Sequence, residues 1–167
     1  SGNPDIWIID LVRGTRSRLT FDPADDFRPV WSPDDSRILF SSSRAGAGDL
    51  HLKAAAGTGG EEVFLETGGL NIPQSWSADG RFIAFNSAQP NSKTGIDVWV
   101  VSVPDRKAEA FVQSQFVDGG GQFSPDGRWM AYASWESGRQ EIYVQPFPGP
   151  GGKWQISTAG GFYPKWR

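Results

Sequence analysis

The sequence has 167 residues, which is enough for one ordinary domain and too few for two. Its net charge of −3 argues against a nucleic-acid partner, and the absence of cysteine excludes disulfides and thiolate metal sites. With 21 Gly, 12 Pro, 8 Trp and 11 Phe, it is typical of a turn-rich globular chain whose apolar mass lies in aromatic residues. No run approaches the roughly 18 apolar residues that span a bilayer, so we expect no membrane insertion of this segment.

The chain opens with two short segments that we predict to be paired strands. In Asp5-Ile-Trp-Ile-Ile, apolar side chains follow an acidic residue in a pattern typical of a β-strand. A turn is predicted at Arg13-Gly14-Thr15, because Gly accepts the backbone conformations of tight turns. The short segment Arg18-Leu-Thr20 then forms the second strand.

The next stretch, Trp31-Ser-Pro-Asp-Asp-Ser-Arg-Ile-Leu-Phe40, predicts a β-hairpin. Pro sets φ at the first turn position, and Asp bonds back to the backbone. Two later copies, at residues 76–85 and 123–132, carry Gly at the next position, where a left-handed conformation is needed. The first copy has Asp35 there. Because Asp tolerates positive φ, we expect the same turn, slightly less stable.

This pattern of strands repeats along the whole chain. The aromatic residue that leads each hairpin stands at 31, 76 and 123, and again in Tyr163-Pro-Lys-Trp166, so the steps are 45, 47 and 43 residues. The strand led by an acidic residue returns at Asp49, Asp97 and Glu141. Four antiparallel strands in each unit of this length are the signature of a β-propeller blade. We therefore predict an all-β propeller of about 3.5 to 4 repeats with no significant helix.

We predict one propeller segment over residues 1–167, with incomplete blades at both ends. Its parts are a partial blade 1–20, blades 28–65, 73–112 and 120–157, and a partial blade 162–167 whose second strand is missing. Three arrangements stay open: a ring in which residues 5–20 complete the last blade of the same chain, an oligomer whose chains complete one another, or a segment of a longer propeller. We favour the longer propeller, with self-association as the behaviour of this segment in solution.

The repeated Trp-Ser-Pro-Asp-Gly and Asp-Ile-Trp-Ile motifs, together with Arg18-Leu-Thr20, resemble the TolB-type propeller repeat, a bacterial relative of the WD repeat. The resemblance covers nearly the whole chain. Residues 145–157 also resemble propeller regions attached to bacterial serine/threonine protein kinases. The resemblance implies a periplasmic or extracellular location and a role in binding partner proteins, gating prolyl-oligopeptidase-type peptidases, or scaffolding signalling kinases.

No catalytic constellation is present, so we expect this chain not to be an enzyme. The single histidine, His51, occupies a strand position that holds an aromatic residue in the other repeats, and no Gly-x-Ser-x-Gly motif accompanies it. The glycine-rich stretches 57–60 and 119–121 lack the Lys-Ser/Thr of a phosphate loop. The His-Arg-Asp and Asp-Phe-Gly triplets of kinases are also absent. We therefore expect no cofactor.

An acidic cluster formed by Asp22, Asp25 and Asp26 precedes the first hairpin. It lacks the central Gly and the closing Glu of a calcium-binding loop. We favour a solvated loop and predict no metal ligand, although the alternative of a weak cation site stays open at this point.

Two kinds of loop meet around the channel mouth of a propeller: those that enter the first strand and those that join the second strand to the third. We predict that these loops supply exposed polar and aromatic groups to a protein or peptide partner; the alternative is an ordinary solvated surface. The candidate binding residues are Asp26, Arg28, Arg44, Asn71, Gln89, Lys93, Trp135, Glu136, Arg139 and Tyr163.

The leading functional hypothesis is a non-catalytic binding or scaffold module that also self-associates through its open blade ends. The alternative is a propeller segment of an enzyme, either the gating domain of a prolyl-oligopeptidase-type peptidase or a polysaccharide-cleaving propeller. A third hypothesis is purely structural, a propeller piece whose main property is assembly into a closed ring.

Overall fold

The structure is a computed structural model that describes residues 2–167. The described residues form β-strands and no helix, as predicted. The strands are β1 (Trp7–Ile9), β2 (Arg16–Arg18), β3 (Asp26–Trp31), β4 (Arg37–Ser42), β5 (Asp49–Ala54), β6 (Glu62–Leu65), β7 (Leu70–Trp76), β8 (Phe82–Ala88), β9 (Asp97–Ser102), β10 (Ala108–Val112), β11 (Asp118–Phe123), β12 (Trp129–Ser134), β13 (Glu141–Pro146) and β14 (Trp154–Gln155).

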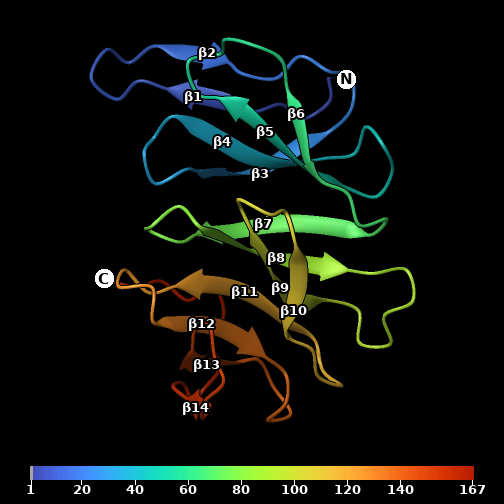
Figure 1. Cartoon of the computed structure of the whole chain (residues 1–167), viewed down its shortest axis with the longest axis vertical. Helices are drawn as coiled ribbons and strands as arrows, with labels where there is room; N and C mark the ends of the chain where they lie inside the picture. Colours follow the sequence, from blue (N-terminus) through green and yellow to red (C-terminus); the bar gives the residue numbers. More distant parts are fainter. Residues whose placement is uncertain (1) are drawn as a thin grey trace.

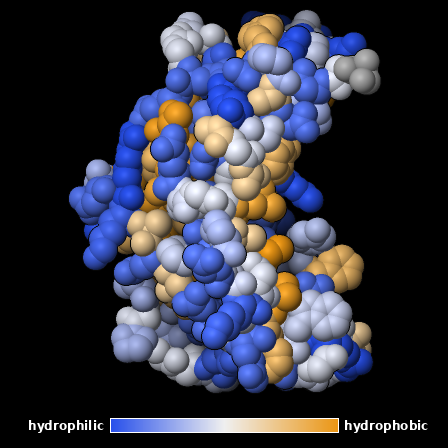
Figure 2. All heavy atoms as spheres, turned by 90° about the vertical axis from the view of Figure 1, so that its right-hand side faces the viewer, coloured by the Kyte–Doolittle hydropathy of each residue, from blue (hydrophilic) through white to orange (hydrophobic). Residues whose placement is uncertain are grey.

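The strands pair in chain order into antiparallel sheets. A two-stranded sheet, β1–β2, is followed by three four-stranded sheets, β3–β6, β7–β10 and β11–β14. Figure 1 shows these sheets stacked in chain order along the long axis, with β1–β2 at one end and β14 at the other. The first strands of the three larger sheets, β3, β7 and β11, contact one another in sequence. Figure 2 shows that one side of the molecule is hollowed. The sheets are therefore the blades of an open propeller arc.

The three hairpin turns are built in the same way. The serine hydroxyls of Ser32, Ser77 and Ser124 each donate to the aspartate two residues later, at 2.6 Å in every copy. The residue after that aspartate has positive φ in all three turns: 57° at Asp35, 74° at Gly80 and 69° at Gly127. The prediction that Asp35 adopts the backbone conformation of the glycine is confirmed, because the short polar side chain tolerates the left-handed region.

Alternating residues of each strand bury opposite faces of the blade. In β4, Ile38 and Phe40 pack toward the N-terminal segment together with Leu19. Leu39, which lies between them, packs with Phe85 of the next sheet. A third apolar cluster joins sheet β7–β10 to sheet β11–β14. Since fully burying one such side chain stabilises a fold by about 1.5–3 kcal/mol, the sheets hold together chiefly through these faces.

The last predicted strand is not formed. Residues 162–167 contain no strand, and the Trp166 indole instead donates to the carbonyl oxygen of Gln122 in β11 at 2.9 Å. A strand needs a hydrogen-bonded neighbour, and no second strand lies beside this segment in the described part of the chain. Among the strands of residues 2–167, β1 and β2 pair only with each other, so they do not complete the last blade within one chain. The single-chain ring is therefore not the observed arrangement.

Candidate binding surface around the inner strands

A cavity of about 300 Å³ lies against the three inner strands, and we call it the inner cavity. Arg28 of β3, Gln74 of β7 and Gln122 of β11 line it, together with Tyr163 and Lys165 from the C-terminal segment. Pairing in each inner strand is interrupted by a shift of register. Such bulges turn side chains away from the regular alternation, which places Arg28 in the cavity wall.

Two residues of the inner cavity have an unusual backbone. Arg28 has φ 56° and Tyr163 has φ 53°, and only four non-glycine residues among those described have positive φ. Left-handed geometry is unfavourable for long and aromatic side chains, and it tends to persist where function requires it. The side chain of Arg28 is exposed and forms no ion pair within residues 2–167, and Tyr163 is 64% exposed. Both therefore remain available to a ligand.

A second cavity, of about 420 Å³, opens at the mouth end of the last sheet, and we call it the mouth cavity. Ile96, Val117 and Phe162 give it apolar walls, and the buried Asp118 also lines it. Tyr163 lines both cavities, so the two form one continuous surface. Trp135 is next to it: this residue is 47% exposed, and its backbone amide donates to the carbonyl oxygen of Val117 at 3.3 Å.

The mouth end of each four-stranded sheet has two equivalent polar positions, which we call its corner pair. The first residue lies opposite a serine in the neighbouring strand, and the second follows that serine by two residues. The corner pairs are Asp26 with Arg44, Asn71 with Gln89, and Asp118 with Glu136. The three pairs therefore carry different charges on the same framework.

In the first corner pair the charges compensate. Arg44 donates to both oxygens of Asp26, at 3.0 and 3.1 Å, and also bonds to Glu61. These charge-assisted bonds raise the pKa of Arg44 against the opposing effect of its burial. Asp26 is 1% exposed, so the prediction that it is an exposed binding residue is wrong. Asp22 lies 3.9 Å from the same guanidinium, so Arg44 is the cation of the acidic cluster.

In the second corner pair both side chains are neutral and hydrogen-bonded within the fold. The Asn71 amide donates to the carbonyl oxygens of Gly48 and Gly69 at 3.2 and 3.1 Å. The Gln89 amide donates to the hydroxyls of Thr67 and Ser87. Asn71 is 0% exposed, so the prediction that it is an exposed binding residue is also wrong. Both corrections have the same physical reason: polar groups at a buried strand end must find partners inside the fold.

The other candidate residues lie on the mouth loops. Glu136 forms an ion pair with Lys153, and Lys93 is exposed on the loop between β8 and β9. Arg139 donates to Glu141 at 2.6 Å and also to the carbonyl oxygen of Thr158, so its guanidinium is engaged. Of the predicted residues, Arg28, Lys93, Trp135 and Tyr163 are exposed and form no side-chain hydrogen bond or ion pair within residues 2–167. Arg28, Trp135 and Tyr163 are the ones that lie at the two cavities.

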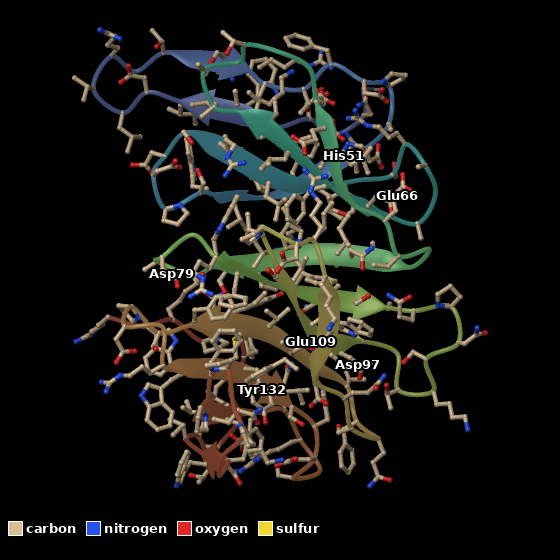
Figure 3. The ribbon with its side chains drawn as sticks, viewed as in Figure 1. His51, Glu66, Asp79, Asp97, Glu109 and Tyr132 are labelled. Carbon is tan, nitrogen blue, oxygen red and sulfur yellow. The ribbon has the colours of Figure 1, made fainter. Side chains whose placement is uncertain are left out.

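His51 lies inside sheet β3–β6, where Figure 3 labels it. It is 2% exposed and stacks on Phe40 with ring centroids 5.8 Å apart. Burial lowers the pKa of His51, which favours the neutral imidazole. No group of three or more His, Cys, Asp or Glu side chains in residues 2–167 is arranged to hold a metal ion. Likewise, no helix long and apolar enough to cross a membrane occurs in the described part.

Three residues of this surface were not predicted from the sequence: Asp118, Gln122 and Lys165. Asp118 could have been found by aligning the repeats, since it stands where Asp26 and Asn71 stand. Gln122 and Lys165 gave no such signal. They belong to the surface because the C-terminal segment folds back against β11, where Lys165 donates to the Gln122 side chain at 3.2 Å.

The three stacked four-stranded sheets with adjacent first strands define the class of this protein: it is a segment of a β-propeller. Residues 1–97 match the family described as the TolB beta propeller domain, so the chain belongs to that family. The sequence is 25% identical to the protein TolB homolog of Chlorobium luteolum over 144 residues, 86% of this chain and 32% of that protein. It is 26% identical to the Tol-Pal system protein TolB of Helicobacter pylori over 134 residues, 78% and 31% of the two chains.

Solved structures show the same fold. TolB from Acinetobacter baumannii superposes with a TM-score of 0.79 at 22% identity, covering 93% of this chain and 38% of that one. A puromycin-hydrolyzing peptidase of Mycobacterium tuberculosis superposes with a TM-score of 0.72 at 14% identity, covering 95% and 28% of the two chains. The chain spans about a third of the length of the two TolB relatives.

Proposed function

We propose that this chain is a non-catalytic binding module of a periplasmic or extracellular protein, and that it recognises a protein or peptide through the inner and mouth cavities. The observation that carries the proposal is that Arg28 and Tyr163, two exposed residues with positive φ, line one cavity. An exposed Trp135 next to this surface adds the kind of aromatic anchor that dominates protein interfaces. Relatives named TolB, one of them a Tol-Pal system protein, support a protein partner and the location.

The test is the triple substitution Arg28→Ala, Trp135→Ala and Tyr163→Ala. A partner is first isolated on the immobilised wild-type chain from a periplasmic extract, and its Kd is then measured by surface plasmon resonance. Loss of two or three interface anchors, each worth 1 kcal/mol or more, weakens binding about 100-fold. The control triple is Val63→Ala, Lys107→Ala and Glu109→Ala on exposed outer positions, of which Figure 3 labels Glu109. Equal affinities of the two triple variants contradict the proposal.

We further propose that the chain self-associates end to end. At one end Trp7 and Ile9 are 50% and 62% exposed, and at the other end Trp154 and Ile156 are 50% and 62% exposed. The second pair belongs to an apolar groove of about 380 Å³ that also includes Trp129, Val144 and Trp166. Equivalent faces of the two preceding sheets are buried against their neighbours, so these open faces favour association.

Light scattering on a sizing column tests this association. We expect a mass that rises with concentration toward a multiple of 18.2 kDa. The double substitution Trp154→Ser and Ile156→Ser should restore the single-chain mass, whereas Val63→Ser on the edge of the first full sheet should not. A single-chain mass for the wild type at every concentration contradicts end-to-end association.

The alternative function is a propeller segment of an enzyme, and one observation favours it. Several similar structures belong to peptidases, including the tricorn protease at 16% identity and a TM-score of 0.64. Sequencing the natural reading frame on both sides of this segment separates the alternatives. An adjoining hydrolase domain supports a gating or polysaccharide-cleaving propeller, and an adjoining kinase domain supports a sensor or scaffold of a signalling kinase.

A further inference from the structure

The third corner pair differs from the other two in its charge. Asp118 and Glu136 stand where the first sheet has Asp26 and Arg44, so an acidic residue replaces the guanidinium. Lys153 pairs with Glu136, and Arg139 pairs with Glu141. No ion pair within residues 2–167 involves Asp118. The third corner therefore lacks the cation that neutralises the first.

Asp118 is buried and incompletely bonded. Its side chain is 0% exposed, and one carboxylate oxygen accepts the Ser114 hydroxyl at 2.6 Å. The other oxygen, Oδ1, has no hydrogen-bond partner of normal geometry among residues 2–167. Burial raises the pKa of Asp118, and the nearby charges of Asp97 and Glu136 raise it further, against the lowering effect of the Ser114 and Ser134 hydroxyls. A buried carboxylate oxygen without a partner destabilises the fold, and a bound cation would relieve this cost.

The surroundings of Asp118 specify the kind of cation. Asp118 lines the mouth cavity of about 420 Å³, which is large enough for an amino-acid side chain. Ile96, Val117 and Phe162 form its apolar walls, and Val117 and Phe162 are 42% and 67% exposed. The neutral polar residues Asn86 and Gln140 also line the cavity. Apolar walls beside a single carboxylate suit a long aliphatic stem that ends in a charge, which is the form of arginine and lysine. They do not supply the several oxygen ligands that a metal ion requires.

We propose that the mouth cavity binds a basic side chain, arginine or lysine, of a protein partner, with its cationic group at Asp118 in the role that Arg44 has at Asp26. This inference rests on the proposed function and adds the chemistry of the partner. Asp118 is the residue that determines specificity, and the apolar walls hold the stem of the bound side chain and its apolar neighbours.

The experiment uses two capped pentapeptides, Gly-Leu-Arg-Leu-Gly and the same peptide with citrulline in place of arginine. Citrulline keeps the shape of the side chain and removes its charge. Amide resonances of the ¹⁵N-labelled chain are followed during titration with each peptide. We expect at least about 10-fold tighter binding of the arginine peptide, because a bond between two charged groups is stronger than one to a neutral group.

Two variants test the site itself. Asp118→Asn imitates Asn71 and should remove the preference for arginine over citrulline. Glu136→Arg restores the charge arrangement of the first corner and should abolish peptide binding. The matched control Asp25→Asn, an exposed carboxylate on a loop, should leave the preference unchanged.

Three outcomes would overturn this inference: equal binding of the two peptides, no binding of either peptide, or the same resonance shifts with calcium or magnesium chloride alone. The proposed function has its own test. If Arg28→Ala, Trp135→Ala and Tyr163→Ala weaken binding of the natural partner while Asp118→Asn does not, the binding surface stands and the basic-side-chain site fails.

Discussion

The two ends of each inner hairpin follow different rules. At the turn end, the same serine-to-aspartate hydrogen bond recurs three times with the same length, 2.6 Å. At the mouth end, the corner pairs are an ion pair, a neutral amide pair and two carboxylates. A tight turn is defined by its own few residues, so its chemistry repeats. A corner pair depends on the loops around it, so repeats of one framework can acquire different binding properties.

The largest expected effect comes from breaking the first corner pair. Arg44→Met leaves Asp26, which is 1% exposed, without its counter-charge. We expect a loss of about 3 kcal/mol in the free energy of unfolding, measured by urea denaturation, because removing one partner strands a buried charge. The double variant Asp26→Asn and Arg44→Gln copies the second corner and should recover much of that loss. A wild-type stability for Arg44→Met contradicts this account.

The next effect comes from placing in the second corner pair the carboxylate that the third corner pair has at its first position. In Asn71→Asp, a carboxylate replaces an amide that donates to the carbonyl oxygens of Gly48 and Gly69. Because an ionised carboxylate only accepts hydrogen bonds, it faces two unpaired acceptors. We expect a loss of about 2 kcal/mol at neutral pH, measured by urea denaturation. The loss should shrink at acidic pH, where the new carboxyl is protonated, and a loss independent of pH would count against the explanation.

A smaller effect is expected at the turn end. Asp35→Gly removes a side chain from a position with φ 57°, so we expect a gain of about 0.5 kcal/mol in unfolding free energy. The matched exchange Gly80→Asp, at φ 74°, should cost a similar amount. Thermal unfolding of the two variants checks the sign. If both exchanges destabilise the protein, the turns are not equivalent.

The smallest effect is on the pH dependence of the protein's stability. Acidification removes stabilisation at the turn end of the hairpins and adds it at the mouth end. Hydrogen bonds from Ser32 and Ser124 hold the pKa of Asp34 and Asp126 at about 2, below the ordinary 3.8. Their stabilisation is complete above about pH 4 and is lost as the pH falls toward 2. The pKa of Asp118 is raised by burial, so protonation of this group on acidification stabilises the fold instead.

Thermal unfolding between pH 2 and 5 measures this difference. Ser32→Ala and Ser124→Ala should flatten the acidic decrease in Tm, and Asp118→Asn should remove the opposing contribution. If none of these variants alters the dependence of Tm on pH, these side chains are not the source of the pH dependence.

Comparison of the repeats shows which features could be predicted from sequence. The propeller class, the positive φ of Asp35 and the strand position of His51 follow from repeated local patterns. The binding surface was predicted less well. Asp26 and Asn71 were expected to be exposed, but partners 18 and 23 residues away bury and bond them.

The sequence by itself determined the turns, the alternation of the strands and the order of the blades, because each depends on residues close together in the chain. The tertiary structure decided the rest. It placed Tyr163 and Lys165 beside Arg28. Within residues 2–167 it also left the segment 162–167 without a strand partner and buried Asp118 without a cation. These outcomes depend on which distant segments meet, and on the free energy of burying polar groups where they do.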